Sequence, residues 1–106
     1  MLPATPAHTE PSWFGCVLTV REGAGFARAD LVKFLEANRI ETRTLFAGNL
    51  LRHPAFQSIA HRVSGTLDVT DRVMRDTFFV GVYPGLDDAR LDYMASAFDR
   101  FMSGER

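Results

Sequence analysis

Two arginines flank a Gly-Asn turn near the middle of the chain, and they are the residues best suited to chemistry. Arg43 lies at the end of a short alternating segment, Gly48-Asn49 forms the turn, and Arg52 follows it. A guanidinium can donate two parallel hydrogen bonds to a carboxylate or phosphate, and the backbone N–H groups and side-chain amide of such a turn can add more. The sequence therefore suggests an anion-binding corner built from Arg43, Asn49 and Arg52.

A more ordinary role is open for each part of this corner. Alternate residues of a strand share a face, so Arg43 and Glu41 lie side by side and can form a surface ion pair. Gly-Asn is also a common turn dipeptide with almost no functional specificity. On these residues alone, the surface ion pair is the more frequent outcome.

No complete catalytic apparatus is readable in the remaining residues. His8, His53 and His61 do not have the spacing of metal ligands, and we expect no metal site. The single cysteine, Cys16, excludes an internal disulfide and a four-cysteine metal or iron–sulfur site. Lys33 is the only lysine, and the pattern of its segment places it on a solvent-facing side of a helix, where it is a poor Schiff-base candidate. Whether this chain is an enzyme by itself is left open.

Composition and charge exclude several partners. With 106 residues and a net charge of −1, the chain gives no reason to expect nucleic acid or an anionic membrane surface as a partner. No apolar run approaches the roughly 20 residues that span a bilayer, and the first residues lack a signal-peptide pattern. We expect a cytoplasmic protein.

The helices and strands that must position this corner are predicted from hydrophobic periodicity and from the Gly- and Pro-containing turns that interrupt it. We expect a flexible lead-in or former linker over residues 1–12 and a single domain over 13–103. The expected strands are 13–20, 40–45 and 77–83, and the expected helices are 27–38, 69–76 and one that begins at Asp87 or Asp88 and ends near Gly104. A helical turn is expected within 52–63. These elements predict an α+β fold: a small two-layer sandwich whose three-stranded sheet carries helices mainly on one face.

Three details of this prediction can be checked residue by residue. Apolar residues occupy both the odd and the even positions of the first strand, which predicts that both of its faces are covered. Together with the following helix and strand it forms a βαβ-like unit. Helix 27–38 should bury Leu31, Phe34, Leu35 and Asn38, expose Arg28, Lys33 and Glu36, and lack a capping side chain at Ala27. The other helices should be capped by Asp68 or Thr70 and by Asp87 or Asp88, and the last should bury Leu91, Met94, Phe98 and Phe101.

Three blocks of sequence together resemble one protein family. The blocks are Pro11-Ser12-Trp13-Phe14-Gly15, the stretch from Arg39-Ile40-Glu41-Thr42-Arg43 through Leu45-Phe46-Ala47-Gly48-Asn49-Leu50, and residues 70–85. They are similar to the C-terminal small domain of the DegT-type sugar aminotransferases, and most of all to the branch of CDP-4-keto-6-deoxyglucose 3-dehydratases of lipopolysaccharide biosynthesis. The resemblance covers the chain from about Pro11 to Phe101.

The resemblance implies the small domain of a fold-type-I pyridoxal-phosphate (PLP) enzyme that works as a cytoplasmic homodimer on nucleotide-linked keto-sugars. It implies pyridoxal phosphate or pyridoxamine phosphate (PMP) as cofactor of the full-length enzyme, bound mainly by a large domain that is absent here. The segment from Arg43 to Asn49 would line the cleft between domains, with Arg43 and Asn49 contacting anionic groups of substrate or cofactor and Phe46 packing beside them. Arg52 completes this set of candidates.

We therefore interpret the chain as the small domain of a PLP/PMP-dependent nucleotide-sugar dehydratase or aminotransferase of deoxysugar and lipopolysaccharide biosynthesis. It should bind no cofactor alone, be inactive alone, and require the missing large domain or a homodimer partner. The alternative is a stand-alone binding or interaction module for an anionic ligand or for a separate large-domain partner.

Overall fold

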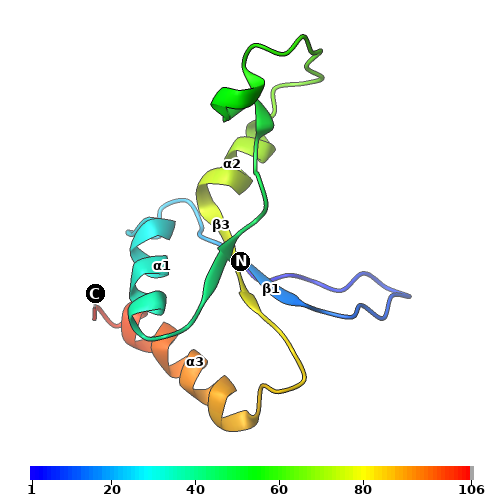
Figure 1. The fold of residues 1–106 in the computed structure, drawn as a ribbon. Coiled ribbons are helices and arrows are strands. Elements are labelled where there is room, and N and C mark those ends of the chain that lie inside the picture. Colours follow the sequence, from blue (N-terminus) through cyan, green and yellow to red (C-terminus); the bar gives the residue numbers. More distant parts are fainter. Residues whose placement is uncertain (106) are drawn as a thin grey trace.

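The computed structural model describes residues 1–105 and contains three strands, three α-helices and two short 3₁₀ helices (Figure 1). In chain order these are β1 (Gly15–Thr19), α1 (Arg28–Ala37), β2 (Thr42–Thr44), η1 (Leu50–Arg52), η2 (Pro54–Phe56), α2 (Asp68–Asp76), β3 (Thr77–Gly81) and α3 (Asp88–Met102). The α+β prediction is confirmed, and each predicted strand is present but shorter than expected at one or both ends.

The last strand lies in the middle of the sheet. The order is β1-β3-β2, and β3 runs antiparallel to both neighbours. Strands β1 and β2 are therefore parallel to each other but not paired, so the predicted βαβ-like unit is a split one, with β3 inserted between its strands. As an edge strand, β1 is only half-buried beyond Gly15, and the prediction that it is covered on both faces is wrong.

Helices α1 and α3 cover one face of the sheet, and the core lies between them and β3. Its buried residues are Leu31, Phe34, Leu35, Ile40, Phe78, Val80, Ala97 and Phe101. Phe101 packs against two rings, with centroid distances of 5.0 Å to Phe26 and 5.4 Å to Phe34. Such close aromatic contacts add specificity to the area that each ring buries.

Helix α1 follows its predicted pattern with two exceptions, Arg28 and Asn38, of which Asn38 is half-buried where full burial was expected. Leu31, Phe34 and Leu35 are buried, and no side chain caps the helix at Ala27. Instead the Asp30 carboxylate accepts a hydrogen bond from the Ala27 backbone N–H at 3.0 Å. The expected solvent position of Arg28 is wrong: its side chain is half-buried because the guanidinium donates to the Thr77 carbonyl at 3.3 Å.

The ends and faces of the other helices correct two predictions. Helix α3 is capped by Asp87, as expected, and its side chain accepts from the Arg90 N–H at 2.9 Å. The expected cap of α2 by Asp68 or Thr70 is wrong, because both lie inside the helix. The residue before the helix is Leu67, which has a left-handed backbone (φ 59°) and no side chain able to cap.

On α3, Leu91 is 48% exposed and Ala97 is fully buried. Of the other residues in the predicted stripe, Phe101 is buried, and Met94 and Phe98 are half-buried. The small side chain of Ala97 lets the helix approach the core closely.

Two segments extend away from this sandwich (Figure 1). Residues 1–12 form an exposed loop that returns to β1, where the Met1 ammonium donates to the Thr19 carbonyl at 2.8 Å. Residues 45–76, here called the arm, comprise the Gly-Asn turn, both 3₁₀ helices, a loop and α2. These extensions raise the radius of gyration to 16.2 Å, compared with about 13 Å for a compact chain of this length.

Candidate functional site

Arg43 lies on the face of the sheet opposite α1 and α3. In the strand register Val17 and Arg43 both stand beside Phe79, so the three residues form one row across the sheet. The neighbouring row contains the buried Thr42 and Val80, which face the helices. Because side chains alternate between faces along a strand, the Val17–Phe79–Arg43 row must point the other way. We call this side of the sheet the open face.

Arg43 is paired in this structure with its neighbour Glu41. The two side chains form an ion pair in which both are mostly exposed, at 68% and 73%. An ion pair exposed to this degree contributes little to stability, and its partners exchange readily with solvent or ligand. The surface ion pair considered in the sequence analysis is therefore present in this structure. It leaves the guanidinium of Arg43 accessible to an incoming anion.

The turn after β2 requires glycine at position 48. Gly48 has a φ of 62°, and a Cβ atom there would lie 2.7 Å from both Cβ and Cγ of Met74. The turn therefore packs directly against α2, and only a residue without a side chain permits this approach. Phe46, which also has a positive φ (49°), projects from the turn and is 76% exposed.

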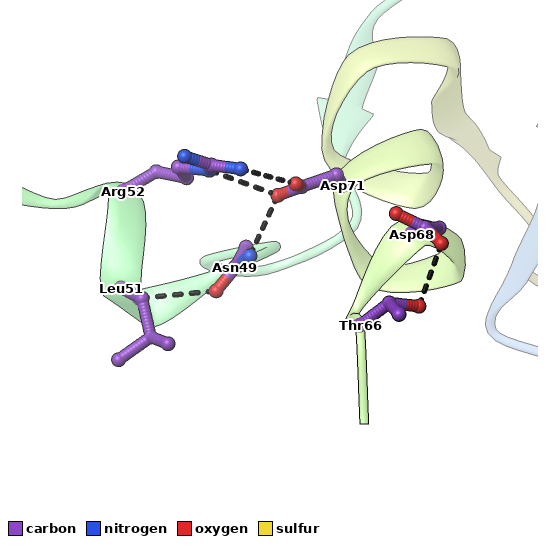
Figure 2. Close-up of polar contacts among 6 residues, drawn as sticks. All are labelled: Asn49, Leu51, Arg52, Thr66, Asp68 and Asp71. Carbon is purple, nitrogen blue, oxygen red and sulfur yellow. Dashed lines mark hydrogen bonds and ion pairs between the residues drawn. The ribbon is translucent and has the colours of Figure 1, made fainter. Parts of the chain in front are cut away.

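Asn49 and Arg52 meet a residue that the sequence did not single out, Asp71 of α2 (Figure 2). The Asn49 amide donates to Asp71 Oδ1 at 2.6 Å, and its oxygen accepts from the Leu51 N–H at 3.1 Å. Arg52 adds two parallel bonds: Nε donates to Oδ1 at 3.1 Å, and a terminal nitrogen donates to Oδ2 at 2.5 Å. We call these three residues the Asp71 clamp.

The clamp has a clear electrostatic signature. The hydrogen bonds from Arg52 and then from Asn49 lower the pKa of Asp71 to about 2. The same contact raises the pKa of Arg52 above its usual value. At neutral pH the clamp is therefore an ionised carboxylate held by an arginine and an amide, and its charges are already matched.

The predicted anion-binding corner is thus divided into two parts. Among residues 1–105, no hydrogen bond or ion pair joins Arg43 to Asn49 or Arg52. Asp71 was missed because it lies 19 residues from Arg52 and 22 residues from Asn49. One local signal was available: Asp71 and Met74 are three residues apart and share the face of α2 that meets the turn.

The residues around Arg43 do not include the lysine of this chain. Its one lysine, Lys33, is exposed on α1, and α1 packs on the sheet face opposite that of Arg43. Within the described part of the chain, no group of three or more His, Cys, Asp or Glu residues could hold a metal ion. What the open face offers a cofactor or substrate is a single exchangeable guanidinium, which suits an anionic group but not the reactive ring.

The sequence model of the DegT/DnrJ/EryC1/StrS aminotransferase family matches residues 1–99. The chain belongs to this family. The family expected from the three sequence blocks is confirmed. No helix in the described residues has the length and apolar character needed to cross a membrane.

Known family members resemble the chain along nearly all of its length. It is 49% identical over 100 residues to the lipopolysaccharide biosynthesis protein RfbH of Salmonella typhimurium, a match that covers 94% of this chain. It is 46% identical over 103 residues to the dTDP-4-dehydro-2,6-dideoxy-D-glucose 3-dehydratase of Saccharopolyspora spinosa, covering 97% of this chain.

Solved structures give the same result for the fold. The E. coli GDP-4-keto-6-deoxy-D-mannose-3-dehydratase with bound hydrated PLP has a TM-score of 0.78 and 25% identity over 91% of this chain. The ColD variant H188K S187N has a TM-score of 0.77 and 26% identity over 92% of this chain.

The chain spans only about a quarter of these proteins. The matches cover 23% of the Salmonella protein, 22% of the Saccharopolyspora enzyme and 25% of the E. coli chain. About three-quarters of the length of each of these relatives has no counterpart in this chain.

Proposed function

We propose that the chain acts as the C-terminal small domain of a cytoplasmic PLP- or PMP-dependent nucleotide-sugar dehydratase or aminotransferase of deoxysugar and lipopolysaccharide biosynthesis. It contributes a substrate-facing surface and is inactive without a cofactor-binding large domain. The observation that carries this proposal is the placement of Arg43 on the open face of a domain that matches between 19% and 25% of the 3-dehydratase relatives. Relatives named for dTDP- and GDP-linked sugars support a nucleotide sugar as the substrate.

The open face has the character of a surface that another domain covers. Phe14 is 67% exposed and lies edge-on to Phe79, with ring centroids 5.8 Å apart. Large exposed aromatic residues beside a sheet face without a helix mark a contact surface. The proposed partner is the large domain, in the same polypeptide, as a separate chain or in a homodimer.

Within this surface the candidate residues divide their roles. Arg43 is the residue proposed to contact an anionic group of substrate or cofactor, because its side chain pairs, among residues 1–105, only with the exposed carboxylate of Glu41. Phe46 is proposed to pack against the bound molecule or the large domain. Asn49 and Arg52 are proposed to act through Asp71, by holding the turn that carries Phe46 in place. PLP or PMP, when bound by the large domain, would supply the carbanion-stabilising chemistry.

Complementation tests the proposal. The large domain of a 3-dehydratase relative, expressed without its small domain, is mixed with this chain, PMP and a nucleotide-linked 4-keto-6-deoxysugar. The proposal expects no turnover with either polypeptide alone and measurable turnover with both. Turnover by this chain alone would contradict it. Binding of the sugar nucleotide by the chain with no gain on adding the large domain would support the alternative, a stand-alone binding module.

A further inference from the structure

Further cationic residues lie next to Arg43, and the function proposed above does not use them. A groove of about 870 Å³ runs between the β2 edge, the end of β3 and the start of α3. Besides Arg43 it is lined by Arg39, Arg90 and two tyrosines, Tyr83 and Tyr93. Guanidinium groups beside aromatic rings suit a ligand that combines phosphate with a planar ring.

Arg39 is held in the groove at a conformational cost. It follows the C-cap of α1 with a φ of 59°, a left-handed backbone that glycine adopts more readily than any other residue. Its side chain is exposed and has no hydrogen bond or ion pair within residues 1–105. An arginine in a position that favours glycine, with no partner for its charge among the described residues, is a candidate for binding an anion.

The remaining cations of the groove can exchange their partners. Arg90 pairs with Asp87 and Arg43 pairs with Glu41, and all four side chains are more than half exposed. Exposed pairs of this kind are weak, so a phosphate can replace a carboxylate as partner. Three guanidiniums against two carboxylates leave a local charge of about +1, which favours an anion.

The two tyrosines differ in how the fold holds them, and Tyr93 is tied by a hydrogen bond. The Tyr93 hydroxyl donates to the Asn38 carbonyl at 3.0 Å, which ties α3 to the end of α1 just before Arg39. The Tyr83 ring lies over Gly85, where an added Cβ would be 2.5 Å from Cε2. Both rings are at least half exposed and line the groove with the arginines, so they offer a nucleobase a surface for stacking.

We propose that this groove binds a nucleoside diphosphate, with Arg39, Arg43 and Arg90 on the phosphates and Tyr83 and Tyr93 against the base. The inference rests on the proposed function, because it assigns to the groove the nucleotide half of the sugar nucleotide. Arg43 then stands between the two halves of the substrate, at the junction of the groove and the open face.

Calorimetric titration of the 106-residue chain with GDP, dTDP, guanosine and inorganic pyrophosphate tests this assignment. Both nucleoside diphosphates should bind with a dissociation constant below about 1 mM, and guanosine and pyrophosphate should each bind at least about tenfold more weakly. Equal binding of pyrophosphate and GDP would show that the tyrosines take no part and would overturn the assignment to a nucleotide. No binding of either nucleotide at millimolar concentration would also overturn it.

Two substitutions of Arg39 separate the effect of its charge from the effect of its left-handed backbone conformation. Arg39→Gln should weaken GDP binding by about tenfold, whereas Arg62→Gln, at an exposed arginine of the arm, should change it less than about twofold. Arg39→Gly should weaken binding as much as Arg39→Gln and also raise the thermal midpoint, because glycine relieves the left-handed backbone. Equal losses in Arg39→Gln and Arg62→Gln, or full binding by Arg39→Gly, would contradict the proposal.

The binding assay and the complementation assay fail independently. GDP titration needs no turnover, so a negative titration with successful complementation would remove the groove assignment and leave the small-domain function standing. Binding of GDP without complementation would remove the small-domain function and leave the groove as a nucleotide-binding site.

Discussion

The two arginines that flank the Gly-Asn turn carry the same guanidinium group, but one is firmly paired within the fold and the other is not. Arg52 is tied to Asp71 by two parallel hydrogen bonds, with Asn49 as a third partner. Arg43, nine residues earlier, rests on an exposed glutamate that contributes little. The difference shows that an arginine beside a turn is a candidate ligand-binding residue only when the fold has left its charge unmatched. Arg52 stabilises the arm, and Arg43 is available to a ligand.

The largest expected effect concerns the packing of the turn on α2. Gly48→Ala should lower the free energy of unfolding by about 2 to 4 kcal/mol, because it combines a positive φ with a Cβ in contact with Met74. Gly23→Ala is the matched control: Gly23 has a φ of 75° but open space around it, so its cost should be only about 1 kcal/mol. Urea denaturation measures both. Equal costs would mean that the turn does not pack on α2 as described.

Removing the amide of the clamp should have the next largest effect. Asn49 is only 4% exposed and satisfies both Asp71 and the Leu51 N–H. Asn49→Ala should therefore lower the free energy of unfolding by about 1 to 3 kcal/mol. Hydrogen exchange in residues 48–52 should accelerate more than exchange in α3. Uniform acceleration throughout the chain would argue that Asn49 has no particular role in the arm.

Acidification should weaken the Asp71 clamp in a defined pH range. The folded-state pKa of Asp71 is lowered to about 2, below an unfolded value of about 3.9. The stability that Asp71 contributes is therefore fully present above pH 4 and is lost as the pH falls toward 2.

Urea midpoints measured from pH 6 to pH 2 should show a steeper acid loss for the natural chain than for Asp71→Asn. Parallel pH profiles would show that the carboxylate is not held as described.

The sequence predicted the elements well, because helical and strand periodicity is local. The buried face of α1, the Asp87 cap and all three strands are examples. It did not predict that β3 lies between β1 and β2, because pairing partners more than 30 residues apart leave no local pattern. The Leu67 start of α2 also could not be read, since the helix there begins without the side-chain cap on which a sequence prediction depends.

For the candidate site, the sequence identified the donors but not the acceptor. Arg43, Asn49 and Arg52 were found because arginine and Gly-Asn turns have recognisable chemistry. Which of them is already satisfied depends on Asp71, in a helix that reaches the turn only in the folded chain. Arg39 was missed because its left-handed backbone is set by the end of α1 and cannot be inferred from residue type.

The most direct test of the account compares the two arginines in the reconstituted enzyme. Arg43→Ala should lower kcat/KM by more than about a hundredfold, roughly 3 kcal/mol of transition-state binding, while changing the free energy of unfolding by less than about 0.5 kcal/mol. Arg52→Ala should lower the urea midpoint, and its effect on kcat/KM should be the smaller of the two. Unchanged kinetics in Arg43→Ala, or a larger kinetic loss in Arg52→Ala, would contradict the central claim that, of these two arginines, Arg43 is the one left free to meet an anion.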